Sequence, residues 1–181
     1  MSISSFIKPW SGFAVRHFPE PSKGQTIDPL DFIWCGKSSE NRWNVLGEAT
    51  LYLAQEKNVA LAEYARHFQV NRSPGLGQKT QKRKVYRLGA SFEATLDLRD
   101  RAVCKALSLN KAPGCFADKK IARSTASFIR NTTAVQAIFV PSIAFLDGLD
   151  KWCLVVFLEK LGSNPRTAFK NVRVDGHFHI S

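Results

Sequence analysis

The pattern of apolar and polar positions along the chain predicts many short strands with a few helices between them. Residues 13–18 (FAVRHF) are rich in aromatic and β-branched side chains, which is typical of a strand. Residues 152–158 (WCLVVFL) form an almost unbroken apolar run, which indicates a buried strand. Further strands are predicted at residues 48–54, at residues 85–98 as one long or two short strands, at residues 135–145 with an interruption at Pro141 and Ser142, and at residues 168–180.

Two segments have the period of an α-helix. The first begins after Asn58, a residue type that caps helix N-termini, and continues to residue 68 with apolar residues at helical spacing. Glu63 lies among these apolar positions rather than on the charged face. The second helix covers residues 118–130, with Asp118 as its cap. Helices inserted among many strands predict an α+β fold with a compact mixed or antiparallel β core.

The chain has the size and composition of one domain. Apolar residues make up 44% of its 181 residues, which is enough for a core, and neither a repeat nor a linker divides residues 1–181. No apolar run reaches the roughly 20 residues of a membrane span. The first ten residues lack the apolar run and cleavage site of a secretory signal. We therefore expect a single domain without membrane contact that acts in the cytoplasm.

Cysteines and histidines give no pattern typical of a metal site. The four cysteines are far apart and form no Cys-x-x-Cys pair, and only His177 and His179 are close histidines. We expect no metal and reduced thiols, although a disulfide stays open if the protein is exported. The cysteines are Cys35, Cys104, Cys115 and Cys153.

A net charge of +11 calls for an anionic partner: nucleic acid, an acidic protein or a phosphorylated small molecule. Residues 78–84 (QKTQKRK) hold four basic residues after the loop-like stretch 73–77. This run contains no aromatic residue, and nucleic-acid arms commonly interleave aromatic with basic side chains, so a solvated loop is favoured. The stretch 74–80 (PGLGQKT) lacks the Gly-Lys-Ser/Thr ending and the strand-to-helix setting of a phosphate loop.

The most specific motif begins at Arg42. Residues 42–54 read RWNVLGEATLYLA, and Tyr52 and Glu63 follow Arg42 at steps of ten and eleven residues. This order resembles the RES family, named for its Arg, Glu and Ser. The segment FVPSIAF supplies the serine as Ser142, and Arg16 in AVRHF matches an early family arginine. The resemblance covers about residues 12–160. Asn41 stands where the family has glycine, and asparagine is the best substitute if that position requires a positive φ.

The resemblance implies an ADP-ribosyltransferase-like fold and a toxin that destroys cellular NAD. Arg42, Glu63 and Ser142 are then the expected catalytic residues. An arginine fork suits phosphate oxygens, so Arg42 and Arg16 are expected to bind NAD. The carboxylate of Glu63 would stabilise positive charge that develops on the ribose, and Ser142 would orient the ribose or the carboxamide.

Two more residues of the motif are expected at the NAD site. Tyr52 offers an aromatic face for the nicotinamide ring, and Asn44 would hold the loop that carries Arg42. Each candidate also has a purely structural interpretation. Arg42 and Glu63 could form an ion pair, and Tyr52 could be a core residue. Ser142 could be a turn residue, and Arg16 could extend along a strand to solvent.

Several functions remain open at this point. The first is cleavage of the nicotinamide–ribose bond of NAD, by hydrolysis or phosphorolysis. The second is ADP-ribosylation of a protein or nucleic acid, and the third is a non-enzymatic, basic nucleic-acid-binding domain. The resemblance also implies a partner, either an antitoxin or, if a secretion system delivers the protein into a target cell, an immunity protein. The oligomeric state is open as well.

Overall fold

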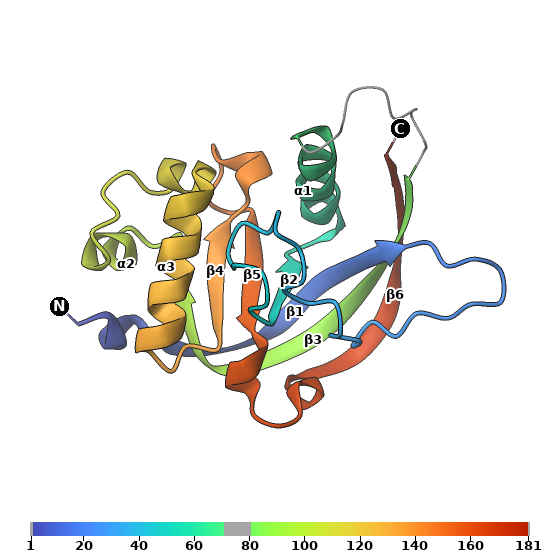
Figure 1. Cartoon of the computed structure of the whole chain (residues 1–181), viewed down its shortest axis with the longest axis horizontal. Helices are drawn as coiled ribbons and strands as arrows, with labels where there is room; N and C mark the ends of the chain where they lie inside the picture. The colour runs from blue at the N-terminus through green and yellow to red at the C-terminus, as the bar shows by residue number, and fades with distance from the viewer. Residues whose placement is uncertain (1, 71–80, 181) are drawn as a thin grey trace.

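The computed structural model describes residues 2–70 and 81–180, and in these residues six strands and three α-helices are found (Figure 1). The strands are β1 (Lys8–Pro19), β2 (Thr50–Ala54), β3 (Gln81–Asp97), β4 (Ala137–Pro141), β5 (Trp152–Phe157) and β6 (Phe169–Ile180). The α-helices are α1 (Lys57–Val70), α2 (Arg101–Ala106) and α3 (Lys119–Thr132). Short 3-10 helices are η1 (Ile3–Phe6), η2 (Gly114–Ala117), η3 (Ile143–Phe145), η4 (Leu158–Leu161) and η5 (Pro165–Ala168).

The sheet closes on itself. Its strands pair in the order β1-β2-β5-β4-β3-β6, and β1 also pairs with β3, so the first five strands in this order form a ring. β3 is long enough to serve several neighbours: it runs antiparallel to β1 and β6, and its end at Thr95–Asp97 runs parallel to β4. The other pairs are antiparallel.

The ring is weakest between β1 and β2. These strands pair only at Val15 and Ala54, whereas β1 and β3 pair along most of the length of β1. Away from this one position β1 and β2 diverge, and side chains from both strands line the larger cavity described below.

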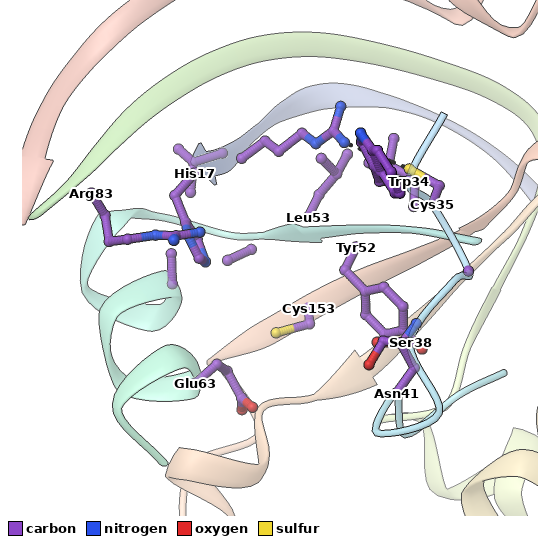
Figure 2. Close-up of a pocket in the computed structure, with 16 residues that line it drawn as sticks. His17, Trp34, Cys35, Ser38, Asn41, Tyr52, Leu53, Glu63, Arg83 and Cys153 are labelled. Atoms are coloured by element: carbon purple, nitrogen blue, oxygen red, sulfur yellow. Dashed lines mark hydrogen bonds between the residues drawn. The ribbon is translucent and has the colours of Figure 1, made fainter. Parts of the chain in front are cut away.

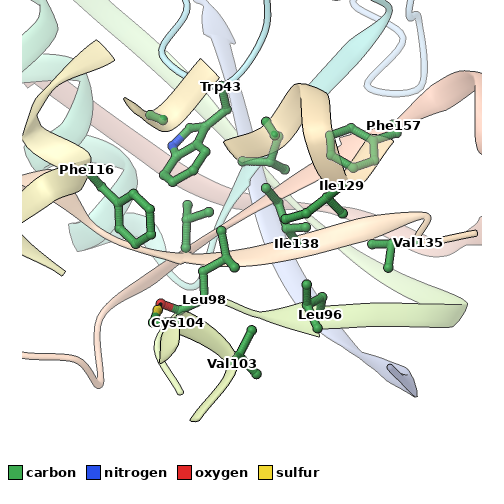
Figure 3. Close-up of a cluster of buried hydrophobic side chains, with 14 of the residues drawn as sticks. Trp43, Leu96, Leu98, Val103, Cys104, Phe116, Ile129, Val135, Ile138 and Phe157 are labelled. Atoms are coloured by element: carbon green, nitrogen blue, oxygen red, sulfur yellow. Dashed lines mark hydrogen bonds between the residues drawn. The ribbon is translucent and has the colours of Figure 1, made fainter. Parts of the chain in front are cut away.

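The alternation of side chains along β5 explains its apolar sequence. Leu154 and Val156 belong to a cluster formed mainly by residues of β1 to β5, which fills the ring. Val155 and Phe157 point the other way, into a cluster beneath α3 (Figure 3). That second cluster includes Trp43, whose ring lies 5.0 Å from the ring of Phe116. Burial of Trp43 therefore fixes the loop on which Arg42 lies.

A third, smaller cluster attaches α1 to the ring. Val59 and Ala60 of α1 are buried against Val15, Val85 and other strand residues. The helix therefore lies over the place where β1 and β2 diverge, and Glu63 is one turn further along it. This arrangement brings the side chain of Glu63 to the edge of the ring.

The predicted α+β class is confirmed, and the predicted strands are present with shifted bounds. The run 85–98 is one strand, which begins earlier, at Gln81. The run 135–145 is split: β4 ends at Pro141, and η3 follows Ser142. Asp118 is the cap of α3, as predicted, because its carboxylate accepts a hydrogen bond from the backbone N–H of Lys120.

Three local features differ from what the sequence suggested. Asn58 does not cap α1, because the backbone N–H of Ala60 already bonds the carbonyl of Glu56 and the helix begins at Lys57. Helix α2 was missed, since its six residues are too few to show a period. Asn41 does not have a positive φ; among the described residues other than glycine, only Ser108 and Asn171 do.

The remaining sequence features have simple outcomes. Residues 71–80 lie outside the described part, and with them the loop-like stretch 73–77 and the first three residues of the basic run 78–84. The rest of that run, Gln81–Lys84, begins β3 rather than a loop. All four cysteines are described and are free thiols. No helix among the described residues is long and apolar enough to cross a bilayer. Residues 2–70 and 81–180 contain no cluster of three or more side chains that could hold a metal ion.

Candidate functional site

Two adjoining cavities open beside α1. The larger has a volume of about 440 Å³ and lies among β1, β2, α1 and the loop before β2 (Figure 2). The smaller, of about 160 Å³, lies between that loop, α1 and the start of α3. Asn41, Tyr52 and Glu63 line both cavities, so the two form lobes of one cleft that meet at these side chains. The larger lobe alone is within the usual size of small-molecule sites.

Glu63 is held at this junction by two hydrogen bonds. Its Oε1 accepts one from the hydroxyl of Ser142 at 2.5 Å and one from the backbone N–H of Ala144 at 3.0 Å. Both bonds use the same oxygen, and within the described part of the chain Oε2 has no hydrogen-bond partner. A carboxylate fixed through one oxygen keeps the other free for a ligand.

Ser142 supports Glu63 and does not line the cleft. The residue is fully buried at the end of β4, where Pro141 ends the strand and η3 begins. The turn after β4 thus supplies both donors to Glu63, the Ser142 hydroxyl and the Ala144 N–H. The hydrogen bond between the serine and the glutamate was not foreseen from the sequence, and the predicted direct contact of Ser142 with a ligand has no support in this geometry.

Arg42 lines the smaller lobe together with Glu63. One nitrogen, Nη1, donates to the backbone carbonyls of Phe116 and Ala117 at 2.9 and 2.7 Å. The structural interpretation as an Arg42–Glu63 ion pair is wrong, because no such pair is found among the described residues. Burial lowers the pKa of Arg42, and the nearby Arg66 lowers it further, while Glu63 opposes these effects.

Tyr52 and Asn44 fix the loop that carries Arg42. The hydroxyl of Tyr52 accepts a hydrogen bond from the backbone N–H of Trp43 at 3.0 Å and donates one to Oδ1 of Asn44 at 2.8 Å. The amide of Asn44 donates to the carbonyls of Val45 and Gly36. Asn44 is buried and does not line the cleft, which fits its predicted role of holding the loop. Tyr52 does line it, so its ring remains available to a ligand.

Arg16 lines the larger lobe and also anchors a loop. Its Nη1 donates to the carbonyls of Pro29 and Asp31 at 2.7 and 2.9 Å, and Nη2 contacts the sulfur of Cys35 at 3.6 Å. The guanidinium also lies 4.5 Å from the centre of the Phe18 ring. Arg16 is therefore not an arginine that extends freely to solvent, and burial lowers its pKa.

Several lining residues were missed by the sequence analysis. Arg66 and Lys119 add positive charge to the smaller lobe, and His17 and Arg83 line the larger one. A signal was available for Arg66, since it is three residues after Glu63 and shares its helix face. Lys119 and Arg83 come from distant segments, and no sequence pattern links them to the motif.

The chemistry of the cleft follows from its charges. Glu63 is a fixed carboxylate at the centre, and cationic side chains lie in both lobes: Arg16 and Arg83 in the larger, Arg42, Arg66 and Lys119 in the smaller. Such a cleft suits a ligand with anionic groups and a centre that becomes positive near Glu63.

Comparisons with known proteins place the fold and the family of the chain. A crystal structure of the M. tuberculosis MbcT–MbcA toxin–antitoxin complex contains a similar chain, with a TM-score of 0.67 and 16% identity over 99% of this chain and 90% of that one. Identity at this level shows a shared fold. No curated protein matches the sequence. The RES domain family matches residues 15–177, which is most of the chain. This protein therefore belongs to the RES domain family.

Proposed function

We propose that the protein is the toxin of a toxin–antitoxin pair and that it cleaves the nicotinamide–ribose bond of NAD. The observation that carries the proposal is the carboxylate of Glu63, fixed by Ser142 and Ala144 between two basic lobes. NAD combines anionic phosphates with a ribose carbon that becomes positive when the bond breaks. Family membership and the toxin–antitoxin likeness support the toxin role.

The proposed reaction uses the residues as follows. The bond between the nicotinamide nitrogen and the ribose C1′ breaks, and its electron pair returns to the nitrogen, so that neutral nicotinamide leaves. The free oxygen of Glu63 stabilises the positive ribose and accepts a hydrogen bond from its 2′-hydroxyl. An acceptor oxygen, of water or phosphate, then bonds C1′ and loses its proton. Arg16 and Arg42 would bind phosphates, and Tyr52 would stack on the nicotinamide.

Substitution at Glu63 tests the proposal. We expect purified protein to release nicotinamide from NAD and Glu63→Gln to lose this activity almost entirely, because the amide carries no charge. We expect Arg42→Ala to lose it too. Ser142→Ala should reduce kcat roughly tenfold or more, because a hydrogen bond to a charged group is worth about 1.5–3 kcal/mol. Nicotinamide release is followed by chromatography.

The control is Glu93→Gln, because Glu93 is exposed on β3. It should match the wild type in activity and thermal unfolding. If wild type and Glu63→Gln consume NAD equally, or neither consumes it, the proposal is wrong. Mass spectrometry of added proteins and nucleic acids separates the alternative, since ADP-ribosyl transfer leaves a modified macromolecule. A nucleic-acid-binding domain would instead bind polyanions with a steep salt dependence that does not change in Glu63→Gln.

Exposed apolar residues at the edge of the cleft support a protein partner. Ile33 and Trp34 on one turn, and Val45 and Leu46 on another, expose about half or more of their surface. The two turns are joined by a hydrogen bond from the N–H of Gly47 to the carbonyl of Gly36. An apolar patch that adjoins a basic cleft at Trp34 suits an antitoxin segment that carries both apolar and acidic residues.

A further inference from the structure

Arg83 is a cation that lines the larger lobe. It comes from the start of β3 and is half-buried, and its guanidinium lies 4.5 Å from the centre of the Tyr64 ring. Burial lowers the pKa of Arg83, with Tyr64 opposing the effect. No carboxylate in the described part of the chain forms an ion pair with it. A half-buried arginine in this position is stabilised when an anion binds beside it.

His17 on β1 fixes the orientation of this guanidinium. Nε of Arg83 donates a hydrogen bond to Nδ1 of His17 at 3.2 Å. A guanidinium can only donate, so Nδ1 is the accepting nitrogen and the ring proton is on Nε2. Burial, with the charges of Arg83 and Arg16, lowers the pKa of His17 to about 3, so the ring is neutral at physiological pH.

The Nε2–H of His17 is accessible from the cleft. It has no hydrogen-bond partner among the described residues. If Nε2 were buried, it would be a buried nitrogen without a partner, but in the described part of the chain the only such side-chain atom is Nε of Arg130. Nε2 is therefore not sealed inside the protein. Because His17 lines the larger lobe, this N–H is available to a ligand there (Figure 2).

These groups match one kind of ligand. Arg83, His17 and Arg16 together present hydrogen-bond donors and positive charge, and Glu63 is the only acidic residue among the described residues that line this lobe. A phosphoryl group offers several acceptor oxygens and negative charge, and an arginine fork binds it in a fixed geometry. We propose that Arg83 and His17 form a phosphoryl-binding subsite in the larger lobe, which holds a phosphate of the dinucleotide. This inference rests on the proposed function for the identity of the ligand.

A substrate without phosphate tests the subsite. We expect Arg83→Gln to lower kcat/KM for NAD at least about tenfold, because a charged hydrogen bond is lost, and to leave kcat/KM for nicotinamide riboside within about twofold of the wild type. Arg87→Gln is the matched control: Arg87 is on the same strand, outside the cleft, and packs over Phe13. An equal fall for both substrates would mean that Arg83 has only a structural role, and would overturn the proposal.

Binding without catalysis keeps the two proposals separate. With ADP-ribose as the probe in isothermal titration calorimetry, we expect a Kd at least about tenfold weaker for Arg83→Gln. His17→Phe should weaken binding several-fold, and Arg83→Lys should restore part of the affinity. An unchanged Kd in Arg83→Gln overturns the subsite. If the wild type binds ADP-ribose, Arg83→Gln weakens this binding and no NAD is cleaved, then the proposed function is overturned and the subsite stands.

Discussion

At the scale of single residues, the cleft uses side chains that each meet two demands. The hydroxyl of Tyr52 closes the Arg42 loop through Trp43 and Asn44, while the residue lines both lobes. Burial raises the pKa of this hydroxyl, so it remains a donor to Asn44. One oxygen of Glu63 is fixed by the protein, and the other has no hydrogen-bond partner among the residues that the structure describes. Ordered side chains of this kind need no rearrangement when a ligand arrives.

The titration of His17 belongs to this scale. Its pKa is about 6.5 in the unfolded chain and is lowered to about 3 in the folded protein. Between pH 3 and pH 6.5 the unfolded chain therefore binds a proton that the folded chain does not. We expect the free energy of unfolding to be highest above pH 6.5 and to fall as the pH decreases, with a contribution from His17 of at most about 1.4 kcal/mol per pH unit.

Urea unfolding at a series of pH values measures this contribution. His17→Gln should show a shallower fall below pH 6.5 than the wild type, because glutamine does not titrate. Exposed His179 on β6 provides the control, and His179→Gln should follow the wild-type curve. If the free energy of unfolding fell equally with pH in the wild type and in His17→Gln, the lowered pKa of His17 would be contradicted.

At the scale of elements, α3 organises one side of the cleft. Its cap, Asp118, precedes Lys119, which lines the smaller lobe. One turn further, the guanidinium of Arg123 donates to the carbonyl of Asn41 from Nε at 3.0 Å and also to the carbonyl of Ser39. The start of this helix therefore holds the loop before Arg42 in place, and its buried face packs beneath into the cluster of Figure 3.

The contribution of the α3 cap to stability can be measured. The carboxylate of Asp118 accepts from the N–H of Lys120 at 2.7 Å. We expect Asp118→Ala to lower the free energy of unfolding by about 1 kcal/mol, since an N-terminal N–H loses its partner. Asp118→Asn, which keeps an acceptor oxygen, should lose much less. Chemical denaturation of the three proteins makes the comparison, and equal losses in both variants would show that the cap is not responsible.

At the scale of the whole molecule, the closed ring and the net charge act together. The ring holds β1 and β2 at one pair, Val15 and Ala54, and leaves them apart elsewhere, so a rigid scaffold carries an open cleft. The chain has a net charge of +11, and cationic side chains line both lobes of that cleft. This charge attracts anionic ligands, and the range of the electrostatic attraction decreases as the salt concentration rises.

Salt therefore tests the role of the overall charge. We expect kcat/KM for NAD to fall about threefold or more between about 50 and about 500 mM NaCl, because the Debye length shortens to a few ångströms. Nicotinamide riboside, which has no phosphate, should show no such fall. Steady-state kinetics with both substrates gives the comparison, and a constant kcat/KM for NAD would exclude long-range attraction as a factor.

Local patterns made much of the fold predictable. The apolar run of β5 reflects burial on both faces, and Asp118 caps α3 by an interaction with a residue two positions away. Such effects depend on neighbours in sequence. Where the local signal was weak it misled: Asn58 suits a cap, yet α1 begins one residue before it, because packing of Val59 and Ala60 against the strands sets the start of the helix.

The sequence by itself determined the α+β class, the order of the strands with α1 and α3, and the motif from Arg42 to Glu63. Only the tertiary structure decided that Ser142, 79 residues from Glu63, is buried behind the glutamate as its hydrogen-bond donor. It also decided that His17 and Arg83, 66 residues apart, meet in the larger lobe. Contacts at such separations come from strand pairing and ring closure, which depend on the whole chain and leave no periodic trace in it.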